Sequence, residues 1–143
     1  VVLASLAKGL GTDAGVILGE SSYIEKIKKH PIFLGASPAS PAALYAMING
    51  KEIYAAAFEK LQANTQLLVS KITDLPIRSV NNFPVFTANL TALNDRLISK
   101  GIVISSFPYP LPTSPLLNRI VVTAGHTKQD ILDIASALRT EIY

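Results

Sequence analysis

A lysine close to the start of the sequence stands among residue types that suit covalent chemistry. Lys8 follows an apolar run and the hydroxyl of Ser5, and it precedes two glycines, Gly9 and Gly11. Glycine lets the backbone turn sharply and approach a bound group closely. A lysine amine that is held in place and partly desolvated becomes a nucleophile or a Schiff-base partner. Lys8 is therefore our first catalytic candidate, and the alternative is a surface lysine in a turn between two strands.

An arginine in the second half of the chain is the candidate for binding a substrate. Arg119 begins an apolar run that reaches residue 123, after a loop that contains Pro108, Pro110 and Pro112. A planar guanidinium holds a carboxylate through two parallel hydrogen bonds. At the start of a strand, the backbone of the arginine would be held in place, and the guanidinium could bind a carboxylate in a fixed position. The alternative is a strand-end arginine in a surface ion pair.

Composition excludes several classes of protein. The 143 residues carry a formal net charge of +3, with 49% hydrophobic and only 16% charged residues, which favours a folded, well-buried chain over disorder. Basic residues are dispersed, so a nucleic-acid surface is not expected. The chain has no cysteine, and His30 and His126 lie far apart in sequence, so we expect no disulfide and no metal site. No apolar run is long enough to span a membrane.

The first residues give no sign of a targeting segment. They lack the basic start and long apolar stretch of a signal peptide, and the single methionine is Met47. An apolar strand at residue 1 leads us to expect a fragment of a longer protein.

The first half is predicted to hold two short strands, a short helix and a long one. Residues 1–7 form a buried strand, residues 15–19 a second one, and residues 24–29 a helix that ends before Pro31. Pro41 suits the first turn of a helix that runs to about residue 73, with a bend near Gly50. Apolar spacing gives this helix one buried face, made of Tyr54, Phe58, Leu61, Thr65, Leu68 and Ile72.

The second half reads as strand, helix, strand, strand, helix, which is an α+β unit. The predicted strands cover residues 84–90, 102–106 and 119–123. The helix between the first two runs from 91 to 100 and ends at Gly101, a left-handed cap position. Thr127 and Asp130 form a capping box for the last helix, whose buried face holds Ile131, Ile134, Ala135, Leu138 and Ile142.

Three segments and the order of the elements resemble one family, the α-oxoamine synthases. The segments are SLAKGLG at 5–11, LNDRLISKGIVIS at 93–105 before the loop FPYPLP, and RIVVTAGHT at 119–127. The family consists of pyridoxal-phosphate acyltransferases with the aspartate-aminotransferase fold (fold type I) and includes 8-amino-7-oxononanoate synthase and glycine C-acetyltransferase. The resemblance covers the whole chain as the C-terminal part of such an enzyme.

The resemblance implies a division of the chain and a set of site residues. Residues 1–40 would be the tail of the large cofactor-binding domain, 41–74 a linking helix and 75–143 a small C-terminal α+β domain. Lys8 would hold pyridoxal 5'-phosphate as a Schiff base, and Ser5 would contact its phosphate. Ser37 is a candidate to lend a hydroxyl to the phosphate of the neighbouring subunit. Arg119 would hold the carboxylate of the amino-acid substrate.

The resemblance also implies a reaction. The parent protein, a cytoplasmic homodimer, would condense a small amino acid with an acyl-CoA thioester and release CO2 and CoA. We favour 8-amino-7-oxononanoate synthase, which uses alanine and a pimeloyl thioester in biotin synthesis, over glycine C-acetyltransferase. An aminotransferase of class I/II on the same fold is the alternative enzyme.

Much of the family's cofactor site precedes the lysine. The aspartate on the pyridinium nitrogen, the aromatic that stacks on the ring and the first phosphate loop all lie upstream in the family. We therefore expect the 143-residue chain alone to be catalytically inactive, as an isolated C-terminal domain. The chain also departs from the family pattern at Ala14, where several members carry a glycine, and at Leu117, where a second arginine is common. Asp13 puts an acidic group near the place where the resemblance expects the phosphate. These departures leave the substrate open.

Overall fold

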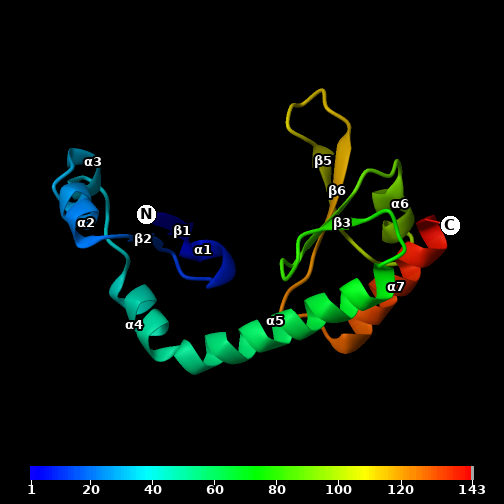
Figure 1. The fold of residues 1–143 in the computed structure, drawn as a ribbon, viewed down its shortest axis with the longest axis horizontal. Coiled ribbons are helices and arrows are strands. Elements are labelled where there is room, and N and C mark those ends of the chain that lie inside the picture. The colour runs from blue at the N-terminus through cyan, green and yellow to red at the C-terminus, as the bar shows by residue number, and fades with distance from the viewer. Residues whose placement is uncertain (143) are drawn as a thin grey trace. The chain divides into compact units, whose positions relative to one another are not determined.

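The computed structural model describes residues 1–142 and divides the chain into two compact units (Figure 1). The first unit comprises residues 1–55 and the second begins at residue 56, so the boundary falls inside the longest helix, α5 (Lys51–Ile72). None of the helices in residues 1–142 combines the length and apolar character needed to cross a membrane.

The first unit begins with a two-stranded antiparallel ribbon. β1 (Val2–Ser5) pairs with β2 (Gly15–Leu18), so that Val2 lies opposite Leu18 and Ser5 opposite Gly15. Between them lies the one-turn helix α1 (Leu6–Gly9). Both strands were predicted, but the first ends at Ser5 rather than residue 7. It is not buried within the described residues either, because a two-stranded ribbon has no layer of its own to cover it.

Two short helices follow the ribbon. α2 (Ser21–Lys28) confirms the predicted helix but begins earlier, and α3 (Pro31–Leu34) is an addition to the predicted elements. Pro31 begins α3 because proline fits the first helical turn, where its missing N–H costs nothing. His30 caps this helix: the backbone N–H of Ile32 donates to its Nδ1 at 3.2 Å.

A glycine separates the next two helices. α4 (Pro41–Asn49) begins at the cap Ser40, whose hydroxyl accepts from the N–H of Ala43, and the chain breaks at Gly50 before α5. A Cβ at Gly50 would lie 2.6 Å from the carbonyl oxygen of Ala46 and 2.9 Å from the ring of Tyr54. The predicted bend is confirmed, and its cause is steric, since only a residue without a side chain fits there.

The second unit is built on a four-stranded antiparallel sheet in the order β3-β4-β6-β5. The strands are β3 (Arg78–Ser79), β4 (Val85–Ala88), β5 (Ser105–Pro108) and β6 (Leu116–Val121). Helix α6 (Leu93–Ile98) follows β4, and α7 (Lys128–Ile142) ends the described chain. The predicted order of elements from residue 84 is confirmed, and β3 is an addition.

Two strand boundaries differ from the prediction for identifiable reasons. The strand expected at 102–106 begins only at Ser105. Ile102 and Ile104 pack against the core without ladder partners, and the N–H of Ile102 bonds to Leu97 O at 2.9 Å to close α6. Gly101, at φ +75°, takes the left-handed conformation expected of it. β6 starts earlier than predicted, so that Arg119 lies inside the strand rather than at its start.

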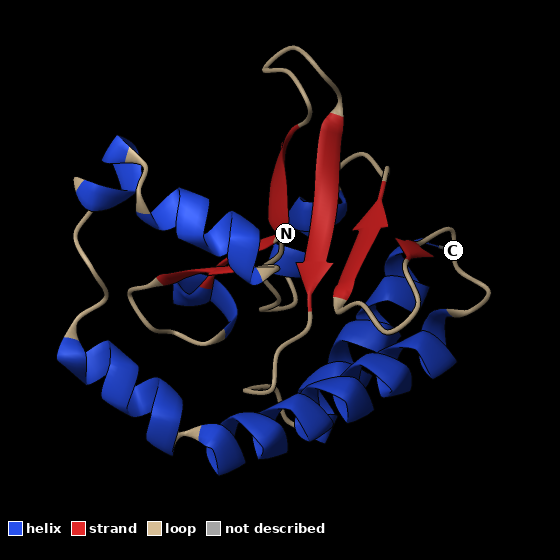
Figure 2. Cartoon of the chain, turned by 60° about the vertical axis from the view of Figure 1, so that its left-hand side comes forward, coloured by secondary structure: helices blue, strands red, loops and turns tan. Residues whose placement is uncertain are grey.

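One face of this sheet carries the core of the second unit. Phe86 of β4 and Ile120 of β6 lie opposite each other and are buried against α6, α7 and the C-terminal part of α5. Figure 2 shows α7 and this part of α5 running side by side on the same side of the strands. The largest fully buried side chains are Phe86, Leu68, Leu93, Leu97, Ile131, Leu138 and Thr65.

The buried stripe of α5 covers only part of what was predicted. Thr65, Leu68 and Ile72 are buried, but Phe58, nearer the start of the helix, is 60% exposed. The stripe therefore packs only where α7 and the sheet lie beside it. Asn64, also buried, donates to the carbonyl oxygens of Thr123 and His126 at 3.1 and 3.0 Å and ties α5 to the turn before α7.

The start of α7 confirms the predicted capping box. The N–H of Thr127 donates to Asp130 Oδ2 at 2.7 Å, and the N–H of Asp130 donates to Thr127 Oγ1 at 3.1 Å. Bonding from the backbone N–H and then from the hydroxyl of Thr127 lowers the pKa of Asp130 below its ordinary value. The predicted apolar face of α7 is buried at Ile131, Ile134, Ala135 and Leu138 and half-buried at Ile142.

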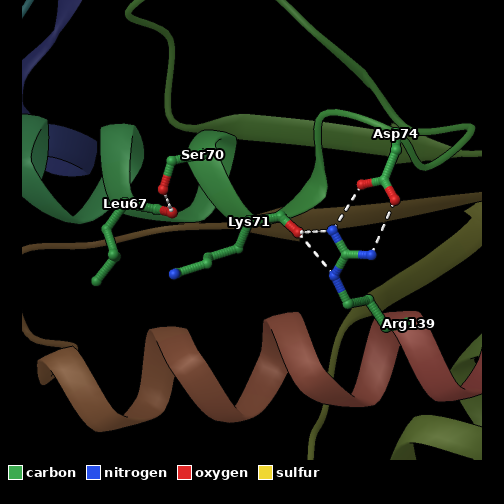
Figure 3. A network of polar contacts seen from close by, with 5 residues as sticks. All are labelled: Leu67, Ser70, Lys71, Asp74 and Arg139. Carbon is green, nitrogen blue, oxygen red and sulfur yellow. Dashed lines mark hydrogen bonds and ion pairs between the residues drawn. The ribbon is translucent and has the colours of Figure 1, made fainter.

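An arginine near the other end of α7 fastens it to the end of α5. Arg139 donates to both carboxylate oxygens of Asp74, at 2.6 and 2.9 Å, and to the carbonyl oxygen of Lys71 at 2.7 and 3.0 Å (Figure 3). In the last turn of α5, Ser70 donates to the carbonyl oxygen of Leu67. Arg139 thus donates to a carbonyl oxygen that the end of α5 leaves without a helical partner, and it pairs with the carboxylate of Asp74 just beyond the helix.

This contact predicts an acid-sensitive contribution to stability. The side-chain hydrogen bonds from Arg139, and then the backbone bond within Asp74, lower the pKa of Asp74 below its ordinary value of 3.8. Because the folded-state pKa is depressed, the stabilisation is present above pH 3.8 and is lost as the pH falls through the folded-state pKa. Asp74→Asn should lower the free energy of unfolding at neutral pH and make its decline in acid less steep. Urea denaturation at neutral pH and at acid pH measures both effects.

Glu59→Gln is the matched control for this experiment. Glu59 is an exposed carboxylate on α5 without an ion pair among residues 1–142, so its removal should leave the acid dependence unchanged. An Asp74→Asn variant with the same acid dependence as the unaltered chain would contradict the prediction.

Candidate functional site

Lys8 lies in the one-turn helix that follows β1. Leu6 is the buried residue of this helix, and the side chain of Lys8 is exposed rather than partly desolvated. Lys8 thus lies exposed in the single helical turn that connects β1 to β2, a position that also fits the alternative of a surface lysine between two strands. No hydrogen bond or ion pair within residues 1–142 engages the amine. Its lone pair or its proton is thus available to a ligand.

Ser5 precedes this helix at its N-cap position. Its backbone is extended, and its side chain makes no capping hydrogen bond, so the hydroxyl is not used by the helix. Space beside the following turn is also open. A Cβ on Gly9 or Gly11 would meet no atom within 4 Å, and Gly11 has a φ of +62° that favours glycine. The hydroxyl, the amine and the open space together leave room for a bound group.

Thr12 is a residue that the sequence did not single out. It is buried at 7% exposure, and its Oγ1 has no hydrogen-bond partner among residues 1–142, although its backbone is bonded to Leu6 and Ala14. A buried hydroxyl without a partner is costly and calls for a ligand or water. The only sequence signal was a hydroxyl shortly after the candidate lysine.

Tyr54 of α5 holds the loop that follows Lys8. Its hydroxyl donates to the carbonyl oxygen of Leu10 at 3.1 Å, across 44 residues of sequence. The sequence predicted Tyr54 on the buried face of the helix, whereas the side chain is half-buried, and the sequence carries no sign of this bond. The contact lies within the first unit and fixes the backbone two residues beyond the lysine.

Ser37 lies in the loop between α3 and α4 and is exposed. Within residues 1–142, no hydrogen bond joins its side chain to Lys8 or Ser5. The structure thus brings Ser5 and Lys8 together on adjacent elements and leaves Ser37 apart from both. Its proposed role toward a neighbouring subunit stays a prediction.

Arg119 lies in the second unit, on the face of the sheet opposite the core. It pairs across the sheet with Thr87 of β4 and Ser105 of β5. Its guanidinium carbon lies 5.1 Å from the ring centre of Phe107, which itself meets Tyr109 edge to face with ring centres 6.4 Å apart. Such a cation–π contact orients the planar fork. No carboxylate within residues 1–142 forms an ion pair with Arg119, so the alternative of a surface ion pair is not seen there.

The other candidates have structural roles. His126 accepts a hydrogen bond from the backbone N–H of Thr123 at 3.0 Å through Nδ1, in the turn before α7. No group of three or more metal-ligating side chains gathers in the part of the chain that the structure describes.

Part of a pyridoxal-phosphate site fits these residues. The cofactor's aldehyde needs an amine, and its phosphate needs hydrogen-bond donors. The exposed amine of Lys8, the uncommitted hydroxyl of Ser5 and the open space beside Gly9 meet these needs. The partnerless hydroxyl of Thr12 adds an unsatisfied polar atom to the same turn.

Comparison with solved structures identifies the fold. The chain aligns with 8-amino-7-oxononanoate synthase from Francisella tularensis at a TM-score of 0.77 and 20% identity, covering 98% of this chain and 44% of that one. Serine palmitoyltransferase from Sphingomonas wittichii aligns at 0.73 and 16% identity, covering 96% and 38%. A serine palmitoyltransferase described with its pyridoxal-phosphate aldimine aligns at 0.71 and 13% identity.

The chain thus spans less than half the length of these proteins, as a C-terminal piece of each. No protein-family model and no curated protein sequence matches it. The likeness in fold extends over nearly every residue of the chain. The chain therefore has the fold of the C-terminal part of a pyridoxal-phosphate-dependent transferase of the kind represented by 8-amino-7-oxononanoate synthase and serine palmitoyltransferase.

Proposed function

We propose that these residues form the C-terminal part of a pyridoxal-phosphate-dependent acyltransferase. The protein would condense a small amino acid with an acyl-CoA thioester and release CO2 and CoA, with 8-amino-7-oxononanoate synthase of biotin synthesis as the first candidate. One observation carries the proposal. A free, exposed lysine stands one helical turn after an uncommitted serine hydroxyl, in a chain with the fold of these transferases.

In this proposal Lys8 holds the cofactor and moves protons. Its amine has no competing ion pair among residues 1–142, so it would be free to hold the cofactor through the aldehyde and to serve as a base at the substrate's α-carbon. Ser5 donates to the phosphate, and Ser37 does the same for the neighbouring subunit of a homodimer. When bound, the cofactor's ring acts as an electron sink for the negative charge formed at that carbon.

Arg119 would bind the substrate's carboxylate. The guanidinium is held over Phe107 with its remaining donors free, and a carboxylate can accept two parallel hydrogen bonds from it. These two hydrogen bonds would fix which bond of the substrate's α-carbon faces the base. We place the active protein in the cytoplasm, and we expect the 143 residues alone to lack turnover because the family's other cofactor contacts precede the lysine.

The experiment follows the fate of both substrates in the full protein that carries this sequence. Purified protein, pyridoxal phosphate, one amino acid at a time and acyl-CoA are mixed, while free thiol and keto acid are measured. Thiol release that requires both substrates supports acyl transfer. Keto-acid formation without thiol would replace the proposal with an aminotransferase, and neither product with any amino acid would favour an inactive module.

A further inference from the structure

The open face of the second unit's sheet carries a row of polar side chains that the proposed function uses only in part. Arg78 lies opposite Thr87, Thr87 lies opposite Arg119, and Arg119 lies opposite Ser105, so these four residues cross all four strands. Residues directly opposite each other in antiparallel strands project from the same face. The neighbouring row of Phe86 and Ile120 is buried in the core, which places the polar row on the other face.

Neither arginine of this row, Arg78 or Arg119, has an ion-pair partner within residues 1–142. Arg139 of the same unit, by contrast, is paired with Asp74. The row itself contains no carboxylate, and its other two members, Thr87 and Ser105, are half-buried hydroxyls that can donate to an anion. The row therefore offers two positive charges and two hydroxyls without an internal counterion.

The two arginines of the row stand on strands that are not neighbours. Adjacent strands lie about 4.8 Å apart, so Arg78 on β3 and Arg119 on β6 stand about 10 Å apart at their backbones. The guanidinium of Arg119 lies over Phe107 of β5, the strand farthest from β3, and so leans away from Arg78. A ligand that carries two acidic groups, one near each arginine, would therefore pair with both.

We infer that the row Arg78–Thr87–Arg119–Ser105 binds an elongated dicarboxylate, with Arg119 on one carboxylate and Arg78 on the other. This inference rests on the proposed function for the role of Arg119 and adds Arg78 as a residue that selects substrates with a second acidic group. A ligand with only one acidic group would form one charge-assisted pair instead of two and would gain less from binding.

The test compares two acids of equal length in the 143-residue chain. Suberate and octanoate differ only in the second carboxylate, and their binding is followed by the arginine Nε–Hε signals in NMR titrations at low salt. Suberate should bind about tenfold more tightly than octanoate, as expected for one additional charge-assisted pair. Succinate, which is too short to reach both arginines, should bind no better than octanoate.

Variants assign the effect to its residues. Arg78→Gln should remove the preference for suberate and leave octanoate binding unchanged, and Arg78→Lys should keep most of the preference. Arg119→Gln should weaken both acids. Lys128→Gln removes one exposed positive charge from α7 in the same unit and should alter neither.

The outcomes separate this inference from the proposed function. Equal binding of suberate and octanoate through Arg119 would overturn the role of Arg78 and leave the carboxylate role of Arg119 standing. Equal losses in Arg78→Gln and Lys128→Gln would mean attraction to net charge only, and would also overturn it. Octanoate that binds independently of Arg119 would contradict the carboxylate site of the proposed function itself.

Discussion

Replacing Lys8 with alanine should abolish turnover in the full protein that carries this sequence. The substitution removes the one amine of the Lys8 turn, which stands beside the hydroxyl of Ser5 and free space. Loss of a positioned proton-transfer group alone lowers rates by about 10²–10⁴-fold, and here the cofactor's covalent attachment is lost as well. Thiol release from acyl-CoA should therefore fall to background, and the visible absorbance of cofactor bound through lysine should disappear.

Lys29→Ala provides the control for this variant. Lys29 is an exposed lysine of the same unit, at the end of α2, and its loss should change neither readout. Free pyridoxal phosphate binds surface lysines weakly, so a signal that drops equally in both variants would point to such nonspecific attachment. Full activity in the Lys8→Ala protein would remove the central assignment.

Replacing Phe86 with alanine should cost the second unit about 3–5 kcal/mol, as for other fully buried phenylalanines. Phe86 has no exposed surface, lies opposite Ile120 in the sheet and packs into the core formed with α5 and α7. Truncation removes its buried apolar area and leaves a cavity between sheet and helices that the rigid surroundings fill only partly. Urea denaturation of the chain should show a lower midpoint with an unchanged slope.

Phe83→Ala is the matched control, since the same residue type sits shortly before β4 with 54% of its surface exposed. Its loss should change stability by about 0.5 kcal/mol or less. Equal losses in the two variants would show that Phe86 does not contribute to the core in the way that its burial indicates.

The elements that the sequence predicted well are those with local signals. Helix ends are marked by residues that are neighbours in the sequence. Examples are Pro41 after Ser40, Gly101, and the capping box of Thr127 and Asp130. The element order of the second unit followed from these ends and from apolar spacing. The fold itself was reached through the resemblance of three segments to a known family and is confirmed by the likeness to solved structures.

Features that depend on distant partners could not be predicted. Strand β3 is only two residues long and exists because β4 lies beside it. The sheet partners of Arg119 follow from strand register, which apolar spacing does not determine. Phe58 matches the helical spacing as well as Leu68 does, yet only Leu68 meets a buried surface.

The candidate site likewise has features that the sequence predicts and features that it does not. Lys8 and Ser5 are close in sequence, so their proximity could be predicted once a helical turn was assumed. The buried, partnerless hydroxyl of Thr12 and the hydrogen bond from Tyr54 to Leu10 both result from tertiary packing, and the sequence carries no pattern that predicts either. The alignment of Arg78 with Thr87, Arg119 and Ser105 likewise becomes visible only when the register of three strand pairs is known.

The break at Gly50 has a consequence beyond the shape of the helices. A side chain at this position would strike the ring of Tyr54, and that ring's hydroxyl holds the carbonyl of Leu10 in the turn after Lys8. Displacement of the ring would break this hydrogen bond, and the turn that carries Lys8 would be held less firmly. In the proposed role of Lys8, the missing side chain at residue 50 would therefore matter to catalysis, and Gly50→Ala should lower activity although residue 50 lies far from Lys8 in sequence.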